Sequence, residues 1–358
     1  MEAPVWRSFW DRLHEGGLRR GESVALLASL ATRMPDRSTL TGLLDSLAGD
    51  RSAGVPDEVG AAVNIVGTGG GPRTFNISTA AALVAAAMGV RVVKTGSRAY
   101  TGSLGSVDLL ERLGVPLTAS YEETHASLEV HGIAFAGAFV YPAELGLLTR
   151  SVLPLDIRQL GGFLNALGPF LARLPARAQL TGVADRRLVT GLRHAAGHLA
   201  RGGARSVWLC VNEAGADELL SFLPNRVYAC EDAMEDEFVL DPARLGLRPG
   251  LPDELRPRDG DPVAHFRELR PRDGDPVAHF RELRPRDGDP VAHFREVLSG
   301  RGAPVAEETV ALNAAALAVA GRVTGDWGDA LAAAREVIRD GRALDLLSRL
   351  RSGADVHA

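Results

Sequence analysis

The sequence predicts an α/β protein, with a small helical domain followed by a larger α/β domain whose mixed, mostly parallel sheet is flanked by helices. Two observations lead to this prediction. Apolar residues recur at helical spacing over residues 5–50, and from residue 63 short apolar runs alternate with helix-forming stretches. A chain of 358 residues is long enough to give both domains a core.

The composition is that of an ordinary globular protein. Apolar residues make up 46%, charged residues 24%, and the formal net charge is −5. This balance creates no general attraction to nucleic acid or membranes. Cys210 and Cys230 lie in no metal-binding or disulfide pattern. Because no apolar run reaches about 18 residues and the first residues lack a secretion signal, we expect a cytoplasmic protein without a membrane span.

The N-terminal region is expected to form short amphipathic helices, because leucine, valine and tryptophan recur every three or four residues between 5 and 50. A polar joint with glycine and proline at 52–58 then precedes the first strand. We therefore expect a helical domain at residues 1–58, joined by helices from about 142–174.

Residues 63–94 have the pattern strand, loop, helix, strand. The run VNIV at 63–66 is a buried-strand candidate, a helix-favouring run from residue 79 ends at Gly89, and VRVVK at 90–94 returns to strand character. Further candidates are a helix at 106–113, an apolar segment at 132–140, helical stretches at 142–152 and 158–174, a helix at 186–200, a strand at 206–211 and two C-terminal helical stretches. The α/β domain should therefore comprise residues 59–141 and 175–358.

Residues 254–295 are three identical copies of ELRPRDGDPVAHFR. In each copy an aspartate is placed to cap a helix, proline occupies its first position, and about two turns can follow. We interpret this triple 14-residue repeat as an insertion of surface helical turns. Histidines 265, 279 and 293 share no face at this spacing, so solvated turns are favoured over a metal site.

A glycine-rich loop follows the first strand directly. GTGGG at 67–71 lets the backbone approach an anion, and NIST at 76–79 opens the next helix with the hydroxyls of Ser78 and Thr79. Unpaired N–H groups and the helix dipole favour negative charge at such a start. We call residues 67–79 the cradle and interpret it as a phosphate site; a plain tight turn is the alternative.

Two cations follow the second strand. Lys94 ends it, and Arg98 lies four residues further on, near the hydroxyls of Thr101, Ser103 and Ser106. The crevice at the carboxyl ends of strands is the usual ligand site of an open α/β sheet, so a multiply phosphorylated ligand would suit these groups. A solvated loop with incidental cations is the alternative.

Adjacent acids follow a later strand. Asp217 and Glu218 lie in GADEL, after the strand candidate at 206–211. Paired carboxylates on such a loop can hold Mg²⁺ against phosphates, because this ion prefers oxygen ligands. A helix-start charge pair is the alternative, but combination with the cradle favours the metal.

Taken together, GTGGG, TFNIST, KTGSRA, GSVDLLERLG, FLNALGP and GADEL, in this order and spacing, resemble the anthranilate phosphoribosyltransferase family within glycosyltransferase family 3. That wider family also includes pyrimidine nucleoside phosphorylases. The resemblance covers roughly residues 5–240 and resumes from the third repeat to the C-terminus. It implies a homodimer formed through the helical domain, with 5-phosphoribosyl 1-diphosphate (PRPP) and Mg²⁺ bound between the domains.

The resemblance also implies roles for particular residues. Asp217 and Glu218, with Ser78, would hold the metal, and Lys94 and Arg98 would be catalytic cations that neutralise the diphosphate. The donor-binding residues that it implies are Gly67, Thr68, Gly69, Gly70, Asn76, Ser78, Thr79, Lys94 and Ser106.

The chain departs from the family pattern at several positions. Gly71 and Pro72 stand where the family usually has Asp and Gly, and Asn64 stands where it has Asp. KHGNRAxSS appears here as KTGSRAYTG, so Thr95 and Ser97 replace a histidine and an asparagine that face the acceptor. Donor geometry is therefore expected to differ.

The arginine that precedes FNxLGPLxNP in the family and meets the acceptor carboxylate has no ungapped counterpart, which leaves Arg150 and Arg158 as candidates. Loss of a bidentate partner costs on the order of a few kcal/mol. We therefore expect a small acceptor other than anthranilate. The acidic run at 231–237 would suit an amine-rich acceptor if it reached the cleft, although a solvated loop is the favoured alternative.

The leading hypothesis is thus a Mg²⁺-dependent phosphoribosyltransferase acting on an amine or hydroxyl, as in aminoglycoside ribosylation. One alternative is anthranilate phosphoribosyltransfer in tryptophan biosynthesis. Another is a non-catalytic binder of anionic ligands or nucleic acid; a nucleoside phosphorylase is disfavoured. No general base is identified, since Asp108 is better placed as a helix cap.

Overall fold

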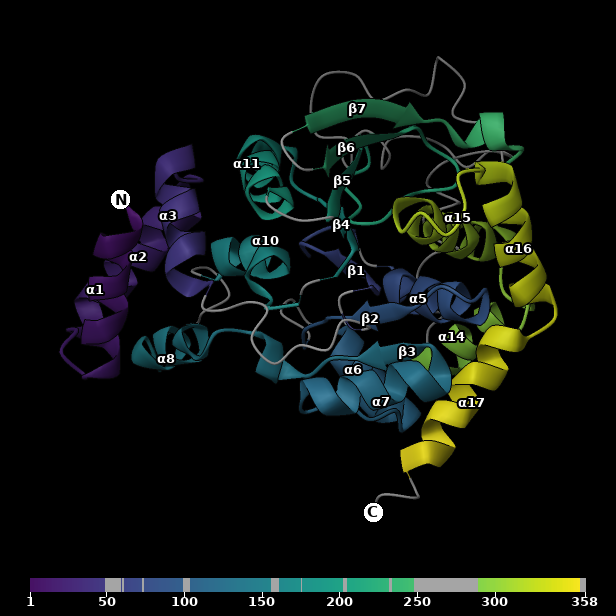
Figure 1. Ribbon diagram of the computed structural model, residues 1–358, viewed down its shortest axis with the longest axis horizontal. Helices are drawn as coiled ribbons and strands as arrows, with labels where there is room; N and C mark the ends of the chain where they lie inside the picture. Colours follow the sequence, from purple (N-terminus) through teal and green to yellow (C-terminus); the bar gives the residue numbers. More distant parts are fainter. Residues whose placement is uncertain are drawn as a thin grey trace.

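A single twisted sheet forms the centre of the protein (Figure 1). The computed structural model describes residues 1–48, 59, 61–72, 74–98, 104–155, 161–174, 176–201, 205–231, 234–247 and 289–354. Within these residues the sheet has seven strands in the order β3-β2-β1-β4-β5-β6-β7. The strands are β1 (Val63–Gly67), β2 (Val92–Lys94), β3 (Ile133–Phe135), β4 (Ala178–Gly182), β5 (Ser206–Asn212), β6 (Asn225–Glu231) and β7 (Met234–Leu240).

Strand direction confirms the predicted mixed, mostly parallel sheet. Strands β1 to β5 pair in parallel, whereas β6 and β7 form an antiparallel ribbon at one edge. The chain moves outward from β1 to β2 and β3, then returns to the other side of β1 with β4 and β5. The order therefore reverses between β1 and β4, and the carboxyl ends of these two strands border the crevice where open α/β sheets bind ligands.

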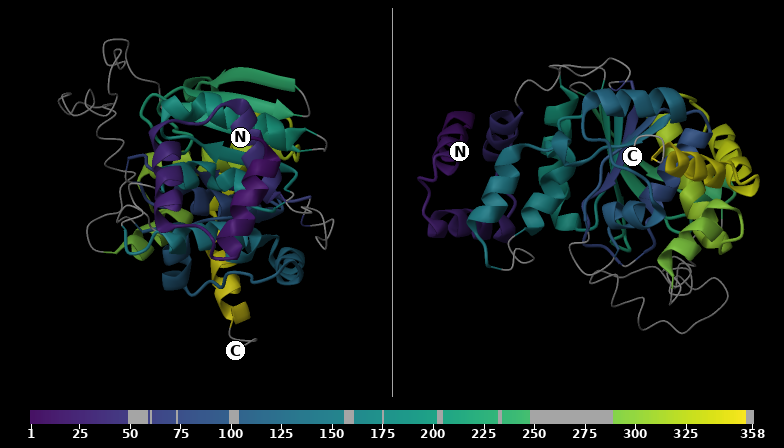
Figure 2. Two further views of the ribbon diagram at one scale, coloured as in Figure 1. Left: turned by 90° about the vertical axis from the view of Figure 1, so that its left-hand side faces the viewer. Right: turned by 90° about the horizontal axis from the view of Figure 1, so that it is seen from below.

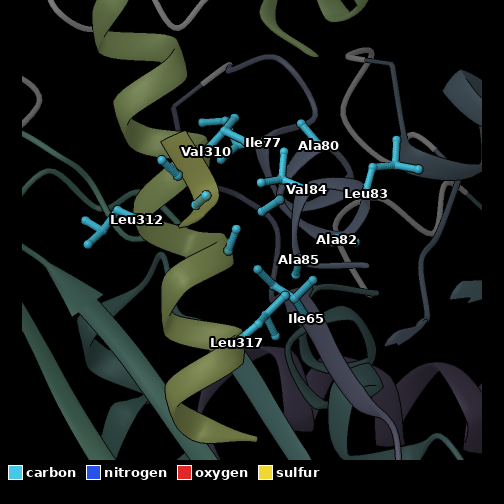
Figure 3. Close-up of a cluster of buried hydrophobic side chains, with 14 of the residues drawn as sticks. Ile65, Ile77, Ala80, Ala82, Leu83, Val84, Ala85, Val310, Leu312 and Leu317 are labelled. Carbon is cyan, nitrogen blue, oxygen red and sulfur yellow. The ribbon is translucent and has the colours of Figure 1, made fainter. Parts of the chain in front are cut away.

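One face of the sheet is covered mainly by helices rich in alanine. Figure 3 shows α5 and α15 facing each other, with Ile65 of β1 beside Ala85 and Leu317 in one continuous core. Small side chains allow these helices to approach each other and the sheet closely. The helices of this region are α5 (Ile77–Ala87), α6 (Ser106–Leu113), α14 (Pro290–Leu298), α15 (Pro304–Ala320), α16 (Trp327–Arg339) and α17 (Arg342–Ala354). Helix α7 (Tyr121–His131) packs on the opposite side of β2 and β3, where Leu128 joins a separate apolar cluster with Val93 and Ala134.

The other face carries the N-terminal helices. The right-hand view of Figure 2 shows these purple helices on one side of the sheet and the yellow-green C-terminal helices on the other. The purple helices are α1 (Ala3–His14), α2 (Arg20–Thr32) and α3 (Arg37–Leu47). The teal helices α8 (Ala143–Ser151), α10 (Gly162–Leu171) and α11 (Val189–Ala200) pack with them on the same face. One apolar cluster joins Trp6, Leu44 and Leu192 to Val207 and Leu209 of β5. The proposed boundary at residue 58 stays a prediction, because residues 49–58 lie outside the described chain.

Several predicted elements match the structure and several were missed. The helix at 106–113 is α6, and the strand at 206–211 is β5. Strand β4 was missed because Gln179 and Thr181 interrupt its apolar pattern. Strands β6 and β7 and helix α7 were also missed, and the last helical stretch divides at Gly341, whose φ is 72°. Short 3₁₀ turns occur at η1 (Ala138–Val140), η2 (Arg186–Leu188) and η3 (Pro242–Leu245).

The end of the third repeat copy is a core helix. The Asp289 carboxylate accepts hydrogen bonds from the backbone N–H groups of Val291 (2.9 Å) and Ala292 (3.2 Å), and Pro290 occupies the first helical position, as predicted. However, His293 and Phe294 are buried, so the expectation of a solvated surface turn is wrong here. The other two copies lie outside the described residues. In the part of the chain that the structure covers, no helix is both long and apolar enough to cross a membrane.

The cap of α14 can be tested by mutation. Asp289→Ala should lower the free energy of unfolding by about 1 kcal/mol, because two backbone N–H groups lose their acceptor. Asp289→Asn is the matched control and should lose much less, since asparagine caps helices well. Urea unfolding of the two variants would measure this, and equal losses would contradict the assigned cap.

Candidate functional site

The candidate site lies where the ends of β1, β2, β4 and β5 meet the start of α5. Two glycines let the loop after β5 approach: a side-chain carbon at Gly67 would overlap the Asp217 carboxylate, and one at Gly182 would overlap the Asp217 backbone. Gly69 and Gly70 have φ values of 71° and 86°, which favour glycine. The glycines of this edge are therefore needed for backbone shape and for close approach of the acidic loop.

The two carboxylates face the cradle. Gly69 donates its backbone N–H to Asp217 Oδ2 at 2.9 Å, and Thr74 Oγ1 donates to Glu218 Oε1 at 3.3 Å. Asn212, at the end of β5, holds this loop, because its side-chain Nδ2 donates to the carbonyls of Ala216 (3.0 Å) and Glu218 (2.8 Å). Asn212 was missed from sequence, where a polar residue after a strand gave no specific signal.

Lys94 is buried at the end of β2, with only 3% of its surface exposed. Its Nζ donates to the carbonyl oxygens of Ile65 (3.0 Å) and Thr95 (3.2 Å). Burial lowers the pKa of Lys94 to about 8, while the nearby charges of Glu218 and Asp217 oppose this shift. The predicted cation, acids and cradle thus come together at one edge of the sheet.

Lys94 is also the only lysine in the sequence; every other one of the 40 Lys and Arg residues is arginine. An ammonium is a compact charge on a flexible stem, whereas a guanidinium is larger and planar. The presence of one lysine among so many arginines is therefore a further sequence signal for this site, in addition to its position at the end of a strand.

The electrostatics of the acids suit a bound cation. Burial raises the pKa of Asp217, and burial together with the Asp217 charge raises the pKa of Glu218 well above its ordinary value. The Glu218 Oε2 atom is buried and makes no hydrogen bond within the described residues. A carboxylate oxygen with no hydrogen-bond partner, next to a second carboxylate, can coordinate a hard divalent cation such as Mg²⁺.

The start of α5 has no side-chain cap. Asn76, at the capping position, instead donates its Nδ2 to the Leu104 carbonyl at 3.1 Å. Ser78 is partly exposed in the first turn, while Thr79 is buried and its hydroxyl has no partner within the described residues. A helix start whose side chain does not cap it can receive an anion.

Three other predicted site residues make hydrogen bonds or ion pairs with groups other than the two acids. Arg98 is 62% exposed on its side chain and pairs with Asp108 (3.1 Å) and Glu111 of α6. Ser106 opens α6, and its hydroxyl donates to the Ser97 carbonyl at 3.5 Å. Thr68 is buried, and its hydroxyl accepts from the Ala184 N–H at 3.2 Å. Their ligand roles stay predictions.

The predicted acceptor residues are only partly described. Arg150 is exposed on α8 and donates from Nε to the Gly146 carbonyl at 3.2 Å, whereas Arg158, Thr101 and Ser103 lie outside the described residues. Ser97 is exposed. The acceptor roles of Ser97, Arg150 and Arg158 stay predictions.

Thr95 and Asn64, two of the departures from the family pattern, contact each other inside the protein. Asn64 Nδ2 donates to Thr95 Oγ1 at 3.1 Å, and neither residue is exposed. Burial raises the pKa of the neighbouring Tyr141. Thr95 is therefore held in a buried polar contact.

The described residues of the acidic run at 231–237 lie at the end of β6 and in β7, on the antiparallel ribbon at one edge of the sheet. Glu231 is opposite Ser206, the first residue of β5, whereas the site lies beyond the last residue of that strand. Glu235 pairs with Arg193, and Glu237 pairs with Arg226. These ion pairs provide a structural reason for the acids that does not involve an amine-rich acceptor.

Comparison with known proteins identifies the family. The model of the glycosyl transferase family, a/b domain, matches residues 59–268. An anthranilate phosphoribosyltransferase of Methylobacterium sp. (strain 4-46) is 33% identical over 256 residues, covering 71% of this chain and 73% of the relative. One from Oleidesulfovibrio alaskensis (strain ATCC BAA-1058 / DSM 17464 / G20) is 38% identical over 212 residues, covering 55% and 58%.

Solved structures of anthranilate phosphoribosyltransferases have a similar fold. The crystal structure of anthranilate phosphoribosyltransferase from Thermus thermophilus has a TM-score of 0.71 and 26% identity, covering 99% of this chain and 96% of that one. The Saccharomyces cerevisiae enzyme in complex with PRPP and Mg has a TM-score of 0.60 and 20% identity, covering 99% and 98%, and supports the fold alone.

The prediction of an acceptor other than anthranilate is wrong, because relatives 31–38% identical over most of the chain bear the name anthranilate phosphoribosyltransferase. That prediction rested partly on Thr95, which the structure places in a buried contact with Asn64. The family and enzyme class predicted from the motifs are confirmed. The chain belongs to the anthranilate phosphoribosyltransferase family of glycosyl transferase enzymes.

Proposed function

We propose that this protein transfers the 5-phosphoribosyl group of PRPP to the amino group of anthranilate, with Mg²⁺ as cofactor. One observation carries the proposal: a buried ammonium and two carboxylates converge on a glycine-rich cradle at the reversal point of the sheet. The named relatives, which are phosphoribosyltransferases of anthranilate, support the choice of acceptor and donor. The buried carboxylates of Asp217 and Glu218 support the metal.

Asp217 and Glu218 are the residues that would hold Mg²⁺. Both supply oxygen donors, and the Oε2 atom of Glu218, which has no hydrogen-bond partner among the described residues, fits a ligand of this ion. We also propose that Ser78 makes a third contact to this ion. When bound, the ion would neutralise negative charge on the diphosphate.

Lys94 would stabilise the departing diphosphate. The C1′–oxygen bond of the sugar breaks as the acceptor nitrogen bonds to C1′, so negative charge grows on the leaving oxygen. A positive charge that is already buried and fixed interacts strongly with that growing charge and needs no reorganisation. Gly69 and Gly70, together with the start of α5, would position the donor phosphates.

We also propose a cytoplasmic homodimer formed through the N-terminal helices. The resemblance to the anthranilate phosphoribosyltransferase family supports this proposal, and Val5 of α1 is an apolar side chain that is 53% exposed there. Cys210 and Cys230 are buried free thiols, consistent with a reducing compartment.

Replacing Lys94 tests the proposed activity. Lys94→Met should lower kcat with anthranilate and PRPP by about a hundredfold or more, because one charged group that stabilises the leaving diphosphate is lost. Arg91→Gln, at the opposite end of the same strand segment, is the matched control and should stay within about twofold. Turnover can be followed by the loss of anthranilate fluorescence. Failure of the wild type to consume anthranilate with PRPP and Mg²⁺ would refute the proposed reaction.

Replacing Glu218 tests the proposed metal ligand. The pKa of Glu218 is raised in the folded protein, so folding favours its protonated carboxyl. The stability that this protonated form provides is fully present below the pKa of the unfolded chain and is lost as the pH rises through the raised pKa of the folded protein. Metal-free Glu218→Gln should therefore be more stable than the wild type at pH 8, and this advantage should disappear near pH 4.

Stabilisation by Mg²⁺ should be lost in the same variant, since a ligand is removed. The matched control is Glu213→Gln, an exposed glutamate in the same loop. Thermal unfolding at both pH values, with and without Mg²⁺, measures both effects. Equal stabilisation of wild type and Glu218→Gln by Mg²⁺ would remove Glu218 from the metal site.

A further inference from the structure

We propose that Asn64 and Thr95 form a positioning pair that fixes the Lys94 ammonium where the diphosphate departs. The catalytic part of this inference rests on the proposed phosphoribosyl transfer. Neither residue is a catalytic residue in the strict sense, because each acts through Lys94.

Asn64 uses both ends of its side-chain amide. Its Oδ1 accepts the backbone N–H of Thr95 at 3.1 Å, and its Nδ2 donates to Thr95 Oγ1 at 3.1 Å. Both residues are fully buried. An amide that donates and accepts at once ties the end of β2 to β1 at two points.

The acceptors of Lys94 lie on the segments that this pair joins. Lys94 Nζ donates to the carbonyl of Ile65, the residue after Asn64, and to the carbonyl of Thr95 itself. The ammonium is therefore held by one carbonyl on each side of the Asn64–Thr95 contact. If the contact loosens, the two carbonyls move apart and the ammonium loses its defined position.

Further hydrogen bonds anchor the pair to the sheet. Asn64 Nδ2 lies 3.4 Å from Gln179 Oε1 on the neighbouring strand β4. Gln179 Nε2 in turn donates to the Pro169 carbonyl of α10 (3.0 Å) and to Thr181 Oγ1 (3.1 Å), and Arg205 donates to Gln179 Oε1 at 3.1 Å. A buried network of this kind is rigid when satisfied, and each lost partner is costly.

The sequence pattern points to the same pair. Residues 64 and 95 are two of the positions where this chain departs from the family pattern, and the structure shows that they are one contact. Aspartate at position 64 would keep the acceptor for the Thr95 N–H, but it would lose the donor toward Gln179. Asparagine and threonine thus form a neutral pair that satisfies itself next to a buried positive charge.

The single lysine makes Lys94 directly observable. Protein grown with lysine carrying ¹³C at the ε-carbon gives one side-chain resonance, which reports the surroundings of Lys94 without any need for activity. The test compares this resonance and the steady-state kinetics with PRPP and anthranilate in the wild type, Asn64→Ala, Asn64→Asp, Thr95→Ser and Thr181→Val.

Thr181→Val is the matched control, because Thr181 is equally buried, bonds to the same Gln179, and makes no bond to Thr95. Asn64→Ala should shift or broaden the lysine resonance and lower kcat about tenfold, with the KM for PRPP within about threefold, because a displaced charge weakens the transition state most. Thr181→Val leaves both Asn64–Thr95 hydrogen bonds in place and should retain the wild-type resonance and rate. Thr95→Ser, which keeps the hydroxyl, should lose less activity than Asn64→Ala.

An Asn64→Ala protein that loses stability but keeps the resonance and kcat of Thr181→Val would overturn the inference, since the role of Asn64 would then be structural only. If Asn64→Ala does not fold, Asn64→Asp decides by the same criteria, with a smaller expected loss. If the wild type shows no transfer to anthranilate, the proposed function fails. The resonance then still decides whether the pair positions Lys94.

Discussion

The structure depends on one electrostatic constraint, a lysine ammonium buried opposite two carboxylates. A buried charge is costly unless it is hydrogen bonded and compensated. Lys94 meets this condition with two backbone carbonyls and the nearby charges of Asp217 and Glu218. These partners come from β1, the end of β2 and the loop after β5, so the strand ends must converge for the charge to be tolerated.

Much of the local sequence follows from this convergence. Gly67 and Gly182 lack side chains where the Asp217 loop approaches, and Asn212 satisfies the backbone of that loop. The carboxylates in turn accept from Gly69 and Thr74 of the cradle. The glycines therefore have two separate purposes, backbone shape at 69 and 70 and close packing at 67 and 182.

The acceptor prediction shows how a motif comparison can mislead. Thr95 was interpreted as a changed acceptor contact, but its side chain is turned into the protein toward Asn64. The acidic run at 231–237 suggests a recognition element from sequence, but its described residues belong to the paired antiparallel ribbon of β6 and β7. In both cases the sequence gives the type of side chain. The direction in which that side chain points depends on contacts of the folded chain, which the sequence does not show.

The sequence by itself determined the fold class and the family, and it singled out the cradle, Lys94 and the acidic pair as residues at strand ends. These features depend on local patterns, namely glycine conformation, helix starts and residues that follow strands. Only the tertiary structure decided that β4 pairs with β1 and brings Gln179 beside Asn64, that Arg98 pairs with α6, and that one side of α14 is buried. These outcomes arise from contacts between residues distant in the chain. The physical reason is that burial and strand order are properties of the assembled sheet, whereas turn and helix-start preferences are properties of a few neighbouring residues.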